Sequence, residues 1–304
     1  MQKFSKMKRI IFLSFFLAAG SAINAQQLMT ASLYDQHGYL FNPATAGATR
    51  HGSIGASYRT MWDGMDGAPK TTLLFGSGYL QNAKIGIGGY IYNDVTGPTR
   101  RTGIQTAYAY HIPLNNDALF SVGLEARFQQ FAIDKGKIQE SLGNDPVMGA
   151  SENRFKGDAG IGVAYTGKKF QAGLSVSQLI QSKLDVYSGN LTRNEEARLY
   201  RHFYLHGSYN WNVDGATKII PNFLVTYLPN APTEFQAGAR VEHSDIFWWG
   251  LAIRAHQSWM LSAGVKIQRK FNIGYCFDIY SNPLSVYDKG ANAHEIMLRY
   301  DFLK

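Results

Sequence analysis

The sequence predicts an all-β protein: a transmembrane antiparallel β-barrel of about 14 strands, preceded by an irregular N-terminal lead-in. Three observations support this fold class. Apolar and polar residues alternate from His51 to the end of the chain, as they do in strands with two unlike faces. Each alternating segment has about ten residues, the length that a tilted strand needs to cross a bilayer. No stretch after the first 25 residues approaches the roughly 18 apolar residues of a transmembrane helix.

Residues 1–25 have the organisation of a cleavable secretory signal peptide. Basic residues crowd the first nine positions, an apolar run covers residues 10–19, and small residues lead to Ala25. The apolar run is too short to span a membrane, which takes about 20 residues. We therefore expect cleavage after Ala25, and we expect no lipid anchor because no Cys follows the cleavage site.

Residues 26–50 form the predicted lead-in. Their periodicity is weak, and they end in the turn segment Asn42-Pro43-Ala44-Thr45-Ala46-Gly47. We expect this segment to lie at or inside the periplasmic mouth of the barrel. Residues 51–304 show no further domain boundary and form the predicted barrel.

The first predicted strand pair encloses a loop rich in glycine and proline. Residues 51–62 alternate, residues 63–70 have loop chemistry, and alternation resumes at Thr71. Proline fixes one φ angle and glycine permits the positive φ of tight turns. The sequence therefore predicts a rigid first loop, formed by Trp62, Asp63, Gly64, Gly67 and Pro69.

This stretch resembles the PorP/SprF family of outer-membrane proteins of the type IX secretion system. The family carries an NPA-x-AG segment and then an R-x-x-W-x-G-x-x-GAP-x-T block. Met61 departs from the family pattern, in which Gln usually precedes the Trp. The residues that match the two motifs are Asn42, Pro43, Ala44, Gly47, Arg59, Trp62, Gly64, Gly67, Ala68, Pro69 and Thr71.

The remaining strands are predicted from the same alternation. One face of each is aromatic and aliphatic with almost no charge, and Tyr, Phe and Trp crowd the strand ends, as in the interface girdles of membrane barrels. These features favour a membrane barrel over a soluble sheet, which also alternates. The predicted strands cover residues 51–62, 70–80, 83–93, 101–112, 118–130, 157–167, 169–178, 199–212, 218–228, 234–243, 246–256, 258–268, 270–280 and 293–303.

The connections support an even number of strands with both ends of the barrel chain in the periplasm. Odd-numbered connections include the long segments 131–156, 179–198 and 281–292, whereas the even-numbered ones are short. Long extracellular loops and short periplasmic turns are typical of outer-membrane barrels. Two odd connections, near residues 229–233 and 256–257, are short and break the pattern.

Composition argues against several classes of function. The net charge of +8 includes four charges of the signal peptide, which leaves too little to favour nucleic acid binding. Cys276 is the single cysteine, so neither an intramolecular disulfide nor a thiolate cluster can form. His202 and His206 would share a strand face about 13 Å apart, too far for one metal ion. We expect no enzyme activity, no cofactor and no metal site.

Charged residues of both signs are predicted to face the lumen. Their mixed signs argue against an ion-selective filter and favour paired networks that stiffen the barrel. The alternative is that these charges line a water-filled pore. Gly86, Gly88 and Gly89 are interpreted as allowing the wall to bend and pack closely. The predicted lumen charges are Arg59, Glu125, Arg127, Lys169, Arg240, Glu242, Arg254, Lys266, Asp278, Glu295, Arg299 and Asp301.

The resemblance implies an accessory role in type IX protein secretion and, in gliding bacteria, in the export of surface adhesins. Its implied partners are outer-membrane lipid, a periplasmic lipoprotein or ring proteins of the secretion machine, and a cargo C-terminal domain or surface adhesin. Phe155, Tyr187 and Tyr287 are the candidate docking residues in the long loops, because aromatic side chains carry much of the binding energy at interfaces. The alternative function is a passive diffusion porin.

Overall fold

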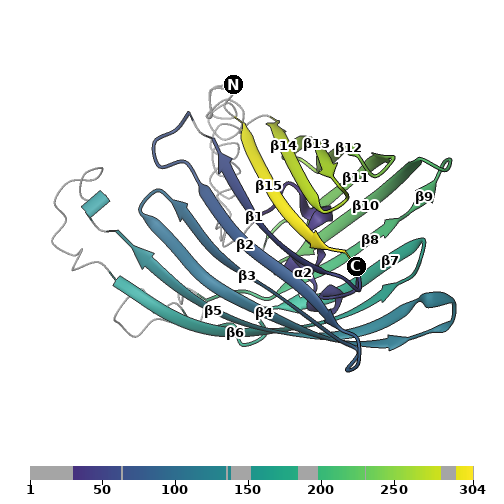
Figure 1. The fold of residues 1–304 in the computed structure, drawn as a ribbon. Helices are drawn as coiled ribbons and strands as arrows, with labels where there is room; N and C mark the ends of the chain where they lie inside the picture. Colours follow the sequence, from purple (N-terminus) through teal and green to yellow (C-terminus); the bar gives the residue numbers. More distant parts are fainter. Residues whose placement is uncertain are drawn as a thin grey trace, which may run out of the picture.

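The chain forms a closed antiparallel β-barrel (Figure 1). The computed structural model describes residues 30–62, 64–134, 136–137, 152–183, 198–229, 231–281 and 292–303. The predicted signal peptide, Asp63 and most of the three long connections therefore lie outside the described residues, and so do Tyr187 and Tyr287. Strand β1 pairs with β15 from Gly52↔Phe302 to Met61↔Ala293, and this pairing closes the sheet.

Each strand pairs with its neighbours in sequence, as in an up-and-down barrel. The strands are β1 (Gly52–Met61), β2 (Lys70–Leu80), β3 (Ile85–Thr96), β4 (Thr99–Pro113), β5 (Leu119–Ile133), β6 (Glu152–Thr166), β7 (Phe170–Ser177), β8 (His202–Tyr209), β9 (Trp211–Asn212), β10 (Thr217–Tyr227), β11 (Glu234–His243), β12 (Phe247–Arg254), β13 (Ser258–Ile267), β14 (Phe271–Tyr280) and β15 (Ala293–Phe302).

The predicted count of 14 wall strands is confirmed, with one difference in detail. The predicted strand 199–212 is interrupted at Asn210, which separates β8 from β9. The pairing with β10 keeps the same register across this break, since Ser208 faces Asn222 and Trp211 faces Ile219. The backbone N–H of Asn210 donates to the carbonyl of Lys169, which lies next to β7 in the β6–β7 turn. Together β8 and β9 therefore occupy one position in the wall.

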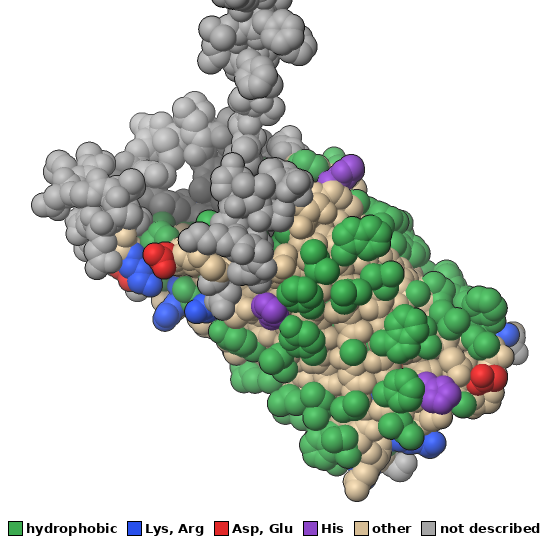
Figure 2. Space-filling view, turned by 90° about the horizontal axis from the view of Figure 1, so that it is seen from above, with side chains coloured by type: hydrophobic (Ala, Val, Ile, Leu, Met, Phe, Trp, Pro, Cys, Tyr) green, Lys and Arg blue, Asp and Glu red, His purple; other side chains and the backbone are tan. Residues whose placement is uncertain are grey.

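The outer surface of the wall is apolar, as the alternation predicts. Leu124 and Leu298 are more than half exposed, whereas the neighbouring Glu125 and Glu295 are buried in the interior. Figure 2 shows hydrophobic side chains spread over the wall and charged side chains gathered towards its ends. A closed barrel with an apolar outer surface leaves no unpaired strand edge in lipid. Among the described residues, no helix has the length and apolarity needed to cross a membrane.

The N-terminal segment lies inside the barrel and is not confined to the mouth on the side of the short turns (Figure 1). It contains η1 (Tyr34–Gln36), α2 (Gly38–Phe41) and η2 (Pro43–Thr45), three short helical turns separated by irregular backbone. Residues 32 and 33 bond to Glu295, near the end of the barrel that carries the odd-numbered connections. Gly47 bonds to Ser77, near the opposite end. The segment therefore runs through the length of the lumen, and we call residues 30–47 the plug.

Candidate functional site

The plug fills the lumen with a mixed apolar and polar core. Because apolar side chains of the plug pack against inward-facing apolar residues of the wall, the barrel has a core like that of a soluble domain. The buried apolar cluster comprises Leu33, Tyr34, Tyr39, Leu40 and Ala46 of the plug and Leu73, Phe75, Tyr90, Tyr92, Ala107, Ala109, Tyr204, Leu224, Trp248, Met260, Cys276 and Met297 of the wall.

The head of the plug, residues 30–33, is bonded to a buried carboxylate. The backbone N–H groups of Ser32 and Leu33 donate to Oε2 of Glu295 at 2.6 and 3.4 Å. The Ser32 hydroxyl accepts a hydrogen bond from Nε of Arg59 at 2.9 Å. Arg59, the arginine of the second motif, is 3% exposed and therefore faces the plug rather than an external partner.

The middle of the plug is bonded to charged residues of β11 and β15. Asp35 pairs with Arg240, which also pairs with Glu242 at 3.0 Å. The side-chain oxygen of Gln36 accepts from Arg299 at 3.2 Å. These contacts favour the structural interpretation of the lumen charges, because both Arg240 and Arg299 bond to the plug.

His37 is a buried histidine whose two ring nitrogens have no hydrogen-bond partner. Its ring meets the edge of Phe75 at a centroid distance of 4.5 Å. Burial, with a smaller contribution from the positive charge of Arg299, lowers the pKa of His37 from 6.5 to about 3. The imidazole is therefore neutral at physiological pH, because a buried charge without a hydrogen-bond partner is unfavourable.

The foot of the plug, residues 42–47, begins at Asn42, which is fully buried. Its side-chain oxygen accepts the N–H of Ala44 and so caps the turn η2. Its amide nitrogen donates to the carbonyls of Val163 and Leu174 at 3.0 and 3.3 Å and lies 3.0 Å from Nε2 of His206. The first residue of the NPATAG motif therefore joins the plug to β6, β7 and β8.

The rest of the foot fits against inward-facing glycines of the wall. A Cβ on Gly86 would lie 1.8 Å from the carbonyl oxygen of Ala46, and one on Gly123 would lie 2.2 Å from the backbone nitrogen of Ala44. Gly162 would place its Cβ 2.0 Å from Oδ1 of Asn42. A side chain at Gly86 or Gly123 would require the backbone to shift, and one at Gly162 would displace the side chain of Asn42. Glycine at these inward positions therefore lets the plug backbone approach the wall.

Two further hydrogen bonds fix the end of the plug. Nε2 of His111 lies 2.8 Å from the carbonyl oxygen of Ala46, and the N–H of Gly47 donates to the hydroxyl of Ser77 at 2.8 Å. Gly47 has a φ of +69°, a conformation that glycine adopts readily. A Cβ at Gly47 would also lie 2.6 Å from Cα of Gly86.

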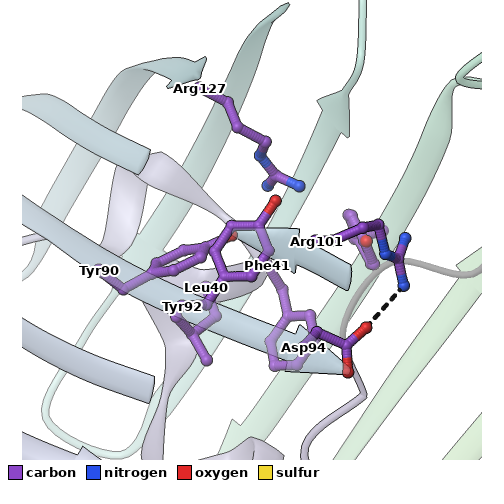
Figure 3. Close-up of a pocket in the computed structure, with 8 residues that line it drawn as sticks. Leu40, Phe41, Tyr90, Tyr92, Asp94, Arg101 and Arg127 are labelled. Carbon is purple, nitrogen blue, oxygen red and sulfur yellow. Dashed lines mark hydrogen bonds and ion pairs between the residues drawn. The ribbon is translucent and has the colours of Figure 1, made fainter. Parts of the chain in front are cut away.

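A cavity remains between the plug and the wall (Figure 3). It holds about 400 Å³ of space, counting the part that opens to solvent. Arg101 is neutralised by Asp94 at 2.9 Å, and Arg127 by Glu125 at 2.9 Å. The two arginines therefore bring no net charge to the cavity. Its lining residues are Leu40, Phe41, Tyr90, Tyr92, Asp94, Arg101, Arg127 and Tyr204.

The first loop is bonded to two neighbouring parts of the rim. Trp62 donates its N–H to the carbonyl of Asn292, and Gly67 accepts from the N–H of Gly97 at 2.8 Å. Gly67 has a φ of +75°. Thr71, the last residue of the second motif, donates its hydroxyl to Asp94 at 2.8 Å. These contacts tie the loop to the β3–β4 turn and to the start of β15.

The predicted docking residues are not brought together by the described part of the chain. Phe155 lies in β6 rather than in a loop, is 70% exposed and stacks on Phe128. Tyr187 and Tyr287 lie outside the described residues.

Lys169, predicted to face the lumen, lies exposed in the β6–β7 turn. The two histidines considered for a metal ion have other neighbours: Nδ1 of His202 lies 2.9 Å from the carbonyl oxygen of Tyr200, and His206 contacts the plug.

Sequence reasoning missed the residues that receive the plug. The available signal was the presence of glycine at inward positions of β3, β5, β6 and β7, where large side chains would otherwise fill the lumen. Residues that act in this way are Gly86, Gly88, Gly123, Gly162 and Gly173. Among the described residues, no group of three or more His, Cys, Asp or Glu side chains is placed to hold a metal ion.

The fold is similar to solved outer-membrane barrels of very different sequence. The toluene transporter TbuX of Ralstonia pickettii superposes with a TM-score of 0.51 at 9% identity, covering 87% of this chain and 92% of that one. A FadL homologue of Pseudomonas aeruginosa gives a TM-score of 0.50 at 10% identity, covering 86% and 93%. At these identities the likeness shows the fold alone.

Sequence comparison assigns the family. No curated protein matches the chain significantly. The family model described as type IX secretion system membrane protein PorP/SprF matches residues 23–300, which include both motif blocks and nearly the whole barrel. The chain therefore belongs to the PorP/SprF family of type IX secretion system membrane proteins.

Proposed function

We propose that the protein is an accessory outer-membrane component of type IX secretion that docks other proteins and does not conduct solutes. The observation that carries this proposal is the plugged lumen. Residues 30–47 occupy the interior and bond to β1, β2, β4, β6, β7, β8, β10, β11 and β15. A lumen that is filled and bonded in this way leaves the two rims as the functional surfaces.

The two rims would serve different partners. The short turns and the foot of the plug would face a periplasmic lipoprotein or ring protein of the secretion machine. The rim with the long connections would face a cargo C-terminal domain or, in a gliding bacterium, a surface adhesin. Phe155, Tyr187 and Tyr287 remain our candidates for apolar anchors on that side. Outer-membrane lipid covers the wall, and we propose no catalytic role.

Two measurements test this function together. Planar-bilayer recordings of the purified barrel should show little steady conductance. Deletion of the gene should leave uptake of small solutes intact, while one or more secreted proteins fail to reach or stay on the cell surface. A large, constant conductance combined with normal surface display would overturn the docking function and support a diffusion porin instead.

The partners are identified by cross-linking in intact cells followed by purification of the barrel from a detergent extract. A cargo protein and a periplasmic component should both be recovered. The matched sample comes from a strain whose chain lacks the residues of the 179–198 connection. That strain should lose the cargo but keep the periplasmic component, because the two bind opposite rims.

A further inference from the structure

We propose that the head of the plug latches the seam of the barrel, so that seating of the plug and closure between the first and last strands form one cooperative unit. The seam is the pairing of β1 with β15, which joins the two ends of the sheet. The latch consists of Ser32, Leu33, Arg59, Asp278 and Glu295. This inference does not depend on the proposed docking function.

Glu295 connects the plug, the first strand and the last strand. Its Oε2 accepts the N–H groups of Ser32 and Leu33 from the plug. Its Oε1 accepts the hydroxyl of Ser57 on β1 at 2.9 Å, while Glu295 itself belongs to β15. One carboxylate therefore bonds to the plug, the first strand and the last strand.

Arg59 completes the latch from the other side of the seam. It stands directly opposite Glu295 in the β1–β15 register. Its Nε donates to the hydroxyl of Ser32, and its terminal nitrogen pairs with Asp278 of β14 at 2.9 Å. Arg59 therefore links the plug to β14 across two strand boundaries.

Burial makes these contacts depend on one another. The side chains of Arg59, Asp278 and Glu295 are at most 3% exposed. A buried charge that loses its partners is strongly unfavourable, because water cannot replace them. An open seam would separate Arg59 from Glu295, and an unseated plug would take two N–H donors from the carboxylate. Plug and seam are thus most stable together.

The wall offers a matched control, Glu125, whose hydrogen bonds and ion pair go to other residues of the wall, including the hydroxyl of Ser177 on β7. Glu125 is also buried, pairs with Arg127 at 2.9 Å and accepts the amide of Gln105 at 2.7 Å. These three residues belong to β4 and β5, far along the sheet from the seam. Glu125→Gln therefore measures the cost of neutralising a buried lumen carboxylate without disturbing the latch.

The first experiment follows the temperature at which the compact band of the folded barrel converts to the unfolded band in gel electrophoresis. Glu295→Gln should lower this temperature by roughly 5 °C or more. Ser32→Ala, which removes only the acceptor of Arg59, should lower it by less. Both variants and Glu125→Gln are then combined with disulfides that restrain chosen strand pairs.

The disulfides distinguish a latch from an ordinary structural contact. Ala56 and Leu298 are register partners across the seam, and Leu74 and Ile91 are register partners between β2 and β3. Cysteines at Ala56 and Leu298 hold the seam covalently, whereas cysteines at Leu74 and Ile91 restrain a pair away from it. Cys276 is buried and can stay in place.

Each loss is measured relative to the otherwise unchanged chain that carries the same disulfide, because any disulfide adds stability by restraining the unfolded chain. With the seam disulfide, the losses caused by Glu295→Gln and Ser32→Ala should shrink, whereas the loss caused by Glu125→Gln should keep its size. The β2–β3 disulfide should leave all three losses unchanged. If Glu295→Gln gives no folded barrel, the same comparison is made on the yield of folded protein. Equal rescue by the two disulfides, or no rescue by the seam disulfide, would overturn the latch.

Discussion

Gly67 stands at a point where both backbone conformation and space exclude a side chain. Its φ is +75°, and a Cβ would lie 2.9 Å from Cα of Gly97. A left-handed conformation costs a residue with a side chain about 1–2 kcal/mol, and most for a β-branched one. Gly67→Val should therefore lower the yield of folded barrel in the outer membrane.

The control for this prediction is Gly215→Val. Gly215 lies in an exposed turn, and a Cβ there would meet nothing within 4 Å. Its yield should match that of the unchanged protein. Normal assembly of Gly67→Val would show that the first loop does not need this glycine and that the prediction of a rigid loop is wrong.

His37 makes the stability of the plugged state depend on pH. Its pKa is lowered from 6.5 to about 3, so between these values the unfolded chain binds a proton that the folded chain does not bind. The stability is complete above pH 6.5 and is lost progressively as the pH falls towards 3. At about pH 4.5 the loss is about 2–3 kcal/mol.

The measurement compares the heat-induced transition at about pH 7.5 and about pH 4.5. His37→Leu should narrow the difference between the two pH values, because Leu fills a similar space against Phe75 without a titrating group. His256→Gln, at an exposed turn, should leave the difference unchanged. An equal acid dependence in the unchanged protein and His37→Leu would contradict this role of His37.

Strand elements were predictable because their signal is local. Alternation and turn residues predicted both ends of β2 and of β11 at the observed residues, and the other strand ends to within five positions. The break at Asn210 was not predictable from the alternation, which continues through this residue.

The plug could not be placed from local pattern, because its contacts are distant in sequence. Asn42 bonds to carbonyls more than 120 positions away, and Ser32 bonds to a residue 263 positions away. The resemblance identified Asn42 and Arg59 as motif residues but not as parts of one interface. Their partners on β6, β7 and β15 are visible only once the barrel is closed.

A substitution at Asn42 tests how the plug is attached to the wall. Its amide donates to two carbonyls and its oxygen accepts one N–H, so it needs a donor and an acceptor at once. Asn42→Asp would turn an acceptor towards those carbonyls, and leaving buried polar groups unpaired costs about 1–3 kcal/mol each.

The expected result is a lower heat-induced transition in Asn42→Asp and increased cleavage of the plug by added protease. Asn222→Asp is the control, because it removes an amide donor that bonds only within the wall, to the carbonyl of Ile220, and keeps the oxygen that accepts from Tyr34 of the plug. If protease cleaves the plug no faster in Asn42→Asp than in the control, the amide donors of Asn42 are dispensable.

At the scale of the whole molecule, the even number of strands and the plug define two unlike ends. The ends of β1 and β15 that are nearest the chain termini meet at Gly52 and Phe302, on the side of the short turns. The head of the plug lies near the opposite end, beside Arg59 and Glu295. With short turns in the periplasm, the plug is held from the outer mouth to the inner one.

Single cysteines labelled on intact cells with a membrane-impermeant maleimide test this orientation. Met65 lies exposed in the first loop, and Gly215 lies exposed in the β9–β10 turn. Met65→Cys should react on intact cells, whereas Gly215→Cys should react only after the outer membrane is permeabilised. Thr30→Cys, half-buried at the head of the plug, should react slowly from the same side as Met65→Cys. Labelling of Gly215→Cys on intact cells, with Met65→Cys protected, would reverse the orientation and would assign the rim with the long connections to the periplasmic partner.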